Sequence, residues 1–188
     1  MAMAGKLNTE LTARFRSAGV DAVGLSGVDG GLLSGPRKSA VRVVEDGKRK
    51  IRRGDHSGKI ESVNADLLTG LLDDGYTPVV SPPMAGDEGD GEVTPVNADA
   101  DRAAAAIAGA LGADLVLLTD VSGVYADPDD PETRIDAAAT PDELAAVEDA
   151  AEGFMGKKVM AAKEAISGGA GRVVIADANV RDPVVAAL

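Results

Sequence analysis

The chain has 188 residues, of which 45% are hydrophobic, 27% charged and 2% aromatic; this is enough for one core or two small lobes and excludes a largely disordered chain. It contains no cysteine, which excludes disulfides, thiolate metal sites and a cysteine nucleophile and favours a reducing cytoplasm. The net charge of −12 disfavours binding to nucleic-acid phosphates, and the lack of a leader pattern or an apolar run of about 18 residues leads us to expect neither secretion nor a membrane span.

The acidic residues are concentrated in three stretches, residues 87–92, 127–132 and 142–152. They fit either a strongly solvated surface or an acidic patch for a partner. The charge indicates the environment of the protein more than its chemistry.

Helical spacing marks the start of the chain. Leu7, Leu11 and Phe15 recur every fourth residue, which predicts a helix over residues 5–18 that ends at Gly19. The apolar run 21–26 then predicts a buried strand, followed by a glycine-rich loop over 27–35.

A hairpin and a helix are expected next. Residues 40–54 alternate around Asp46-Gly47, the strongest short hairpin signal in the chain. Asn64 or Asp66 can cap a helix that ends at Gly75 and has a leucine face made of Leu67, Leu68, Leu71 and Leu72. Residues 76–84 predict another buried strand, and Pro82-Pro83 predicts its break.

In the second half, strands and helices alternate. We expect a helix over 102–111 that ends at Gly112 and then an apolar strand over 114–120. Two helices over 141–150 and 158–166 and a strand over 172–177 should follow. Thr140 and Glu143 form a capping-box pattern before the first of these later helices. Unbroken apolar strands alternating with helices indicate an α/β fold with a parallel sheet.

The segment Asn97-Ala98-Asp99-Ala100-Asp101 stands directly before the predicted helix 102–111. It could be a helix cap, a calcium-type metal loop or the entrance to an active site. The metal loop is disfavoured because Arg-Ala-Ala-Ala follows where a glycine and later a glutamate are needed. One cap needs only Asp99 or Asp101, so the remaining polar side chains favour a further role.

Familiar catalytic patterns are missing. His56 is the single histidine, and the sequence has no serine nucleophile motif with which it could form a catalytic triad. We therefore expect His56 to be a residue of a loop over 54–59. No Walker A or G-x-G-x-x-G loop occurs. Small polar residues do follow the strand 114–118, and Lys157 and Lys158 stand beside glycines near a predicted helix start, which fits a phosphate site or ordinary solvated lysines.

Together, the stretches VNADADRAAAAIAGALGADLVLLTDVSGVY, GFMGKKVMAAKEAI and RVVIAD resemble the amino-acid kinase family. The similarity is greatest to the branch of acetylglutamate kinases and of kinases acting on glutamate or aminoadipate bound to the carrier protein LysW. GVDGGLLSG together with RKSAVRVVEDGKRKIRRGDHSGKIESVN resembles the carrier-dependent kinases in particular. The resemblance implies an αβα sandwich of three layers with a mainly parallel sheet and a β-hairpin insertion. It also implies transfer of phosphate from ATP, with Mg²⁺, to a side-chain carboxylate in arginine or lysine biosynthesis.

The resemblance also implies roles for particular residues. Asn97 would bind the acceptor, Asp101 would orient the active-site lysines, and Lys158 would stabilise the transferring phosphoryl group. The ATP contacts would come from Asp120, Val121, Ser122, Gly123, Val124, Tyr125, Gly156 and Lys157. No residue is assigned to a protein metal site.

Some family features are missing from the printed sequence. The opening K-x-G-G strand and the next acceptor-binding residues have no match, and Lys6 does not replace the lysine of that strand, so we expect an N-terminally incomplete chain. Residues 1–82 would be part of the acceptor lobe, with the hairpin 40–54, and residues 83–188 the nucleotide lobe. A non-catalytic fragment that needs a partner chain is the rival interpretation.

Two kinds of partner are expected. The resemblance implies a homo-oligomer. The basic stretches Arg37–Lys38 and Lys48–Arg53 fit either a solvated hairpin or a docking site for an acidic carrier protein.

Overall fold

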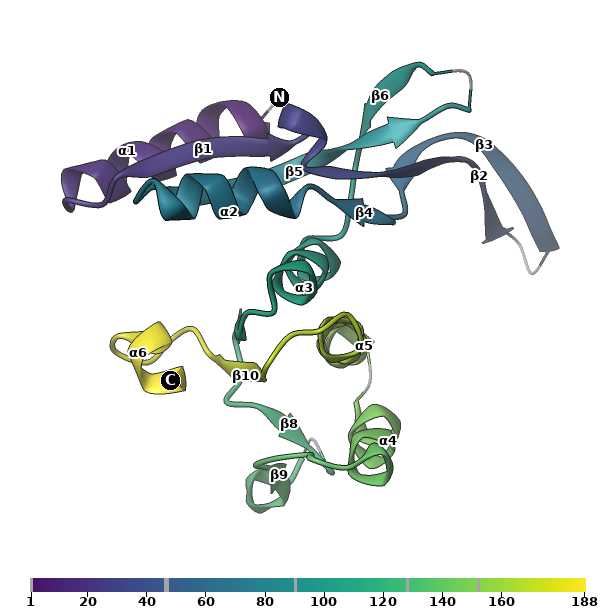
Figure 1. The fold of residues 1–188 in the computed structure, drawn as a ribbon. Helices are drawn as coiled ribbons and strands as arrows, with labels where there is room; N and C mark the ends of the chain where they lie inside the picture. The colour runs from purple at the N-terminus through teal and green to yellow at the C-terminus, as the bar shows by residue number, and fades with distance from the viewer. Residues whose placement is uncertain (1, 46–47, 90, 128, 152) are drawn as a thin grey trace. The chain divides into compact units, whose positions relative to one another are not determined.

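The computed structural model describes residues 2–45, 48–89, 91–127, 129–151 and 153–188, and the side chains of residues 39, 41–45, 48–53, 55, 141 and 154 lie outside that description. Its contacts divide the chain into two compact units, Met1–Ala103 and Ala104–Leu188. The division falls about twenty residues after the boundary suggested by the sequence, because the strand that ends at Asp87 pairs with the next one, Val93–Val96. Figure 1 shows the helices and strands of both units.

Unit 1 is a mixed sheet with helices packed on it. In chain order its elements are a π-helical turn (Ala2–Leu7), α1 (Asn8–Ser17), β1 (Ala22–Gly27), a 3₁₀ turn (Asp29–Gly31), β2 (Leu33–Glu45), β3 (Lys48–Gly58), β4 (Ser62–Val63), α2 (Ala65–Asp73), β5 (Thr77–Asp87) and β6 (Val93–Val96). Its described strands run in the order β1-β5-β2-β3, with β4 on β2 and β6 on β5. The central pairs β1–β5 and β5–β2 are parallel, whereas β2–β3 is the predicted antiparallel hairpin.

Unit 2 repeats the alternation of strand and helix. It begins within α3 (Ala100–Leu111) and continues through β7 (Leu115–Thr119), β8 (Val124–Tyr125), a 3₁₀ turn (Pro131–Thr133), β9 (Arg134–Ile135), α4 (Pro141–Ala150), α5 (Gly153–Ser167), β10 (Val173–Asp177) and α6 (Pro183–Ala187). β7 and β10 are parallel neighbours. Their core joins α3, β7 and α5 through Ala105, Ala108, Leu115, Leu117, Ala161 and Ala165. The α/β class predicted from the sequence is confirmed.

Local signals placed most helix ends correctly. The Asn64 side chain accepts a hydrogen bond from the Leu67 N–H at 3.1 Å and caps α2. Thr140 and Glu143 form the predicted capping box, in which the N–H groups of Ala139 and Thr140 donate to the Glu143 carboxylate and lower its pKa. The predicted stops Gly19, Gly75 and Gly112 all have left-handed φ angles, at 86°, 84° and 62°.

The helix predicted over residues 5–18 is confirmed as α1 with its preceding turn, but its apolar stripe does not face the sheet. Leu7, Leu11 and Phe15 are 48%, 46% and 39% exposed. The inward residue is Asn8, which is buried and donates to the carbonyl of Val79 at 2.7 Å. The spacing of the three apolar residues thus predicted the helix correctly, but it did not identify the face of the helix that is buried.

Three further expectations were wrong. β5 continues through Pro82-Pro83, because the register with β1 skips from Ser81 to Met84 and leaves both prolines unpaired in a bulge. His56 lies exposed in β3 rather than in a loop. α5 begins at Gly153, five residues before the predicted start.

Among the helices described, none combines the length and hydrophobicity needed to span a bilayer.

Candidate functional site

The three polar residues before the alanine-rich helix have three different positions. Asn97 is exposed directly after β6. Asp99 caps α3, because its Oδ1 accepts from the Arg102 N–H at 3.1 Å and its carbonyl accepts from the Ala103 N–H at 2.9 Å. Asp101 is half-buried in the first turn of α3. The helix-cap interpretation is therefore confirmed for Asp99, and Asn97 and Asp101 stand on either side of the cap.

The main chain of Asn97 is bound to the hairpin strand β3. Its N–H donates to the His56 carbonyl at 2.7 Å, and its carbonyl accepts from the Gly58 N–H at 2.9 Å. Ser57 and Asn97 form the corresponding parallel bridge. The position of the Asn97 side chain consequently depends on β3 as well as on β6.

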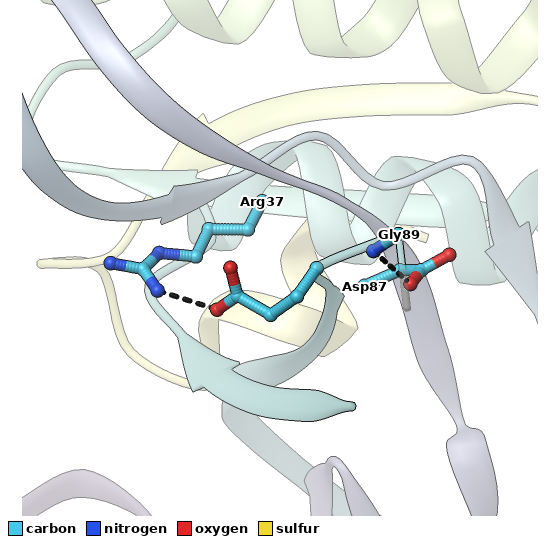
Figure 2. Close-up of polar contacts among 4 residues, drawn as sticks. Arg37, Asp87 and Gly89 are labelled. Carbon is cyan, nitrogen blue, oxygen red and sulfur yellow. Dashed lines mark hydrogen bonds and ion pairs between the residues drawn. The ribbon is translucent and has the colours of Figure 1, made fainter. Parts of the chain in front are cut away.

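Arg37, on β2, forms an ion pair with Glu88, directly after β5 (Figure 2). The two side chains are 19% and 26% exposed. The hydrogen bond from Arg37 and then that from Thr94 hold the pKa of the Glu88 carboxyl below its usual range, against a smaller opposing effect of burial. Glu88 is thus kept as a carboxylate, and the pair contributes to stability above the unfolded-state pKa and loses that contribution as pH falls through the lowered folded-state value.

In unit 2 the residues Asp120–Tyr125 follow the carboxyl end of β7. The Ser122 hydroxyl donates to Asp177 Oδ2 at 3.3 Å, and Asp177 ends the neighbouring parallel strand β10. Asp177 Oδ1 also accepts from the Asn179 N–H at 2.7 Å, and the Asn179 side-chain amide reaches the Asp120 carbonyl at 3.5 Å. The loop after β7 and the turn after β10 are therefore joined at one edge of this sheet, where ligands of parallel α/β proteins bind.

Sequence reasoning did not select Asp177. The signal was present, because Asp177 closes the predicted strand 172–177 and the same rule about carboxyl ends had selected the loop after 114–118.

Part of the predicted nucleotide loop also lines a pocket of about 900 Å³. Ser122, Gly123 and Val124 contribute to its wall, and the remaining wall comes mainly from β9, the loop 136–140, α4, α5 and β10. Gly156, Lys157 and Lys158 do not line it.

Gly156, Lys157 and Lys158 all lie within helix α5, which therefore includes the two residues that were expected just before its start. Lys157 is exposed, whereas Lys158 is half-buried beside Val159, which is 1% exposed. Both lysines interact with other groups of the chain. They stand one turn from the helix N-terminus, whose N–H groups and macrodipole attract anions.

Within the part of the chain that the structure describes, no group of three or more His, Asp or Glu side chains is arranged to hold a metal ion.

The known proteins that this chain resembles in sequence are kinases that act on amino acids. The chain is 46% identical over 189 residues to a LysW-aminoadipate kinase of Deinococcus radiodurans, covering all of this chain and 63% of the relative. It is 42% identical to a LysW-aminoadipate kinase of Thermus thermophilus, covering 69% of that protein, and 47% identical over 178 residues to an acetylglutamate kinase of Methanopyrus kandleri, covering 93% of this chain and 68% of that one. The chain thus spans about two thirds of the length of these relatives.

Solved structures share the fold. N-acetylglutamate synthase from Neisseria gonorrhoeae, complexed with coenzyme A and N-acetyl-glutamate, matches with a TM-score of 0.64 at 24% identity, over 93% of this chain and 37% of that one. Carbamate kinase from Giardia lamblia bound to AMP-PNP matches with a TM-score of 0.55 at 21% identity, over 73% of this chain and 46% of that one. The model of the amino acid kinase family matches residues 1–177. Since that match covers nearly the whole sequence, the chain belongs to the amino acid kinase family.

Proposed function

We propose that this protein is an ATP-dependent kinase that phosphorylates the side-chain carboxylate of glutamate or aminoadipate attached to a carrier protein, in arginine or lysine biosynthesis. The structural observation that carries the proposal is the junction at the carboxyl ends of β7 and β10, where Asp177 holds the Ser122 loop. The names of the relatives from Deinococcus and Thermus support the substrate class. The relative from Methanopyrus supports the alternative acceptor, free N-acetylglutamate.

For this phosphoryl transfer the protein has to position the two reactants and to neutralise negative charge. A carboxylate oxygen of the acceptor attacks the γ-phosphorus of ATP, the bond from that phosphorus to the bridging oxygen breaks, and ADP leaves with the electron pair. The nucleophile is already an anion, so no base has to remove a proton. Catalysis then consists of aligning two anions and neutralising the charge between them.

The residues present fit a triphosphate. α5 starts with Gly153, its first turns carry Gly156, Lys157 and Lys158, and N–H groups at a helix start together with lysines bind phosphate oxygens. In the proposed assignment Lys158 stabilises the transferring phosphoryl group, Asp101 orients Lys158, and Asn97 binds the acceptor. Gly156, Lys157 and the loop Asp120–Tyr125 contact ATP, which arrives with its Mg²⁺.

The lobes divide the work in the same proposal. Residues 1–82 form part of the acceptor lobe and residues 83–188 the nucleotide lobe. Asn97, which is assigned to the acceptor, lies beyond residue 82 but still within the compact unit Met1–Ala103. A homo-oligomer and a cytoplasmic location also remain predictions. The exposed stripe of Leu7, Leu11 and Phe15, on α1 and the turn before it, supports the oligomer, because a second copy could bury it.

The decisive test is acceptor-dependent release of ADP. With carrier-bound aminoadipate or glutamate, we expect ADP together with an acyl phosphate that hydroxylamine traps as a hydroxamate. Free N-acetylglutamate serves as the competing acceptor, and its preferential use would favour the alternative kinase. Nucleotide binding without ADP release from any acceptor would favour the rival interpretation, a non-catalytic nucleotide-binding fragment that needs a partner chain.

The hairpin is proposed to dock the carrier through charge. Nine of the chain's 19 Lys and Arg residues lie in residues 37–59, against three of its 31 Asp and Glu residues. Arg49, Arg52 and Arg53 belong to β3, and their side chains lie outside the described set. A basic hairpin on an acidic protein attracts an acidic partner and accelerates its association.

Reversing Arg49, Arg52 and Arg53 to glutamate should therefore raise KM for the carrier-bound acceptor about tenfold or more, because the docking charge is inverted. The KM for ATP should stay unchanged, as measured in the same ADP-release assay. Reversal of Arg14, Arg16 and Arg181 changes the net charge equally and is the control. Equal effects of the two triple variants would contradict docking on the hairpin.

A further inference from the structure

A closed ring of contacts in unit 1 links Arg37 to Asn97. Arg37 is the Cα partner of Gly58 in the β2–β3 ladder, and the Gly58 N–H donates to the Asn97 carbonyl. From Asn97 the chain leads back through β6, which pairs with the end of β5, to Glu88. The Arg37–Glu88 ion pair then closes the ring. It joins residues 51 positions apart.

Glu88 and its neighbour Gly89 are also held by hydrogen bonds from their backbone N–H groups. The Gly89 N–H donates to Asp87 Oδ1 at 2.8 Å (Figure 2), and the Glu88 N–H donates to the Glu92 carbonyl at 3.3 Å. Asp87 pairs with Val93 at the end of the β5–β6 ladder. A displacement of Glu88 therefore moves the ladder that leads into Asn97.

The interior of the ring is tightly packed. Met84 and Val96 are both 0% exposed. A Cβ added at Gly58 would lie 2.8 Å from Met84 Sδ and 2.9 Å from Val96 Cγ2, and one added at Gly86 would lie 2.8 Å from Val96 Cγ2. The backbones of β3 at Gly58 and of β5 at Gly86 thus pack directly against the side chains of Met84 and Val96. Close-packed elements transmit small shifts instead of absorbing them.

We propose that the Arg37–Glu88 ion pair is a positioning device that holds Asn97 in place for the acceptor, with Arg37 and Glu88 as positioning residues. This inference rests on the proposed function, in which Asn97 binds the acceptor. The pair also links the basic hairpin, through Arg37 on β2, to Glu88 directly after β5, and β5 pairs with the strand β6 that precedes Asn97. A carrier bound to the hairpin and the acceptor bound at Asn97 would thus be held by one connected set of strands. A charge-assisted pair that is only 19% and 26% exposed is suited to this, because water competes less for it than for a surface pair.

The test compares Arg37→Gln, Glu88→Gln and the double variant Arg37→Glu with Glu88→Arg. Two measurements are made on each chain: hydrogen exchange at the Asn97 and Gly58 amides, and KM for acceptor and for ATP. We expect each single variant to speed exchange at both amides and to raise the acceptor KM about tenfold, the usual size of one lost charge-assisted bond. The ATP KM and kcat should stay within about twofold, and the reversed pair should recover most of the loss.

Arg172→Gln is the matched control, because Arg172 pairs with Asp114 at 3.2 Å in unit 2. It should leave both measurements at wild-type values. Faster exchange with an unchanged acceptor KM would overturn the positioning role, and unchanged exchange would overturn the ring itself. If the wild-type chain used no acceptor, the proposed function would fail and the acceptor role of the pair with it, whereas the exchange data would still decide whether the ring exists.

Discussion

Replacing Lys158 with methionine is expected to lower kcat by about 10²–10³, the usual effect of removing one group that stabilises transition-state charge. Methionine keeps an unbranched chain that can pack beside the buried Val159. The ammonium is lost, and with it the compensation for negative charge on the transferring phosphoryl group. ATP binding should change much less, because Lys157 and the loop Asp120–Tyr125 remain.

Substitutions of two other lysines, Lys157 and Lys6, serve as controls for this test. Lys157→Met removes the adjacent, exposed lysine and should raise the KM for ATP more than it lowers kcat. Lys6→Met, in the π-helical turn before α1, should have no effect, because Lys6 is not expected to act as a second active-site lysine. Initial rates of ADP release over a range of ATP concentrations separate the three outcomes. A Lys158→Met protein with kcat within threefold of wild type would remove Lys158 from the proposed mechanism.

The fold was predictable wherever neighbouring residues decide the structure. Thr140 and Glu143 form a capping box from side chains three positions apart, and Gly112 ends α3 because glycine adopts a left-handed φ without strain. The β2–β3 hairpin was likewise predicted from its alternation and its Asp46-Gly47 turn, which itself lies outside the described residues. Such signals need no knowledge of the rest of the chain.

Contacts between distant residues were not predictable. Pro82-Pro83 reads as a break, and only the partner strand β1 shows that the sheet accommodates both residues in a bulge. The stripe of Leu7, Leu11 and Phe15 sets the helical period, yet Asn8 faces the sheet because Gly24 leaves room for its side chain. The strand β6 was missed because four residues that include a proline carry little strand signal.

The candidate site likewise has features that local sequence predicts and contacts that it does not. The sequence predicted a helix cap at Asp99 or Asp101, and the structure places it at Asp99. The roles of Asn97, Asp101 and Lys158 came from resemblance to a family and remain predictions. The Asp177–Ser122 and Arg37–Glu88 contacts join residues 55 and 51 positions apart. No local pattern pairs such residues, so only the folded chain could show them.

The substitution Gly35→Ala is expected to destabilise unit 1 by about 3 kcal/mol, near the upper end of the usual cost of overpacking. Gly35 lies in β2, where the chain at residues 59–61 crosses it. The Lys59 N–H donates to the Pro36 carbonyl at 3.2 Å, and the Glu61 N–H donates to the Ser34 carbonyl at 2.9 Å. These bonds hold the Lys59 carbonyl so that a Cβ on Gly35 would lie 2.0 Å from its oxygen.

Relief of this clash is costly, because the obstacle is backbone and cannot rotate away. On its other side Gly35 pairs with Gly86 of β5, so β2 cannot retreat without breaking the parallel ladder. The expected loss would appear as a lower urea midpoint in far-UV circular dichroism. Gly70→Ala is the matched control, since Gly70 is exposed within α2 with nothing within 4 Å of an added Cβ, and alanine should stabilise that helix by about 0.5–1 kcal/mol. An unchanged midpoint for Gly35→Ala, beside a raised one for Gly70→Ala, would show that residues 59–61 do not cross β2 as closely as described.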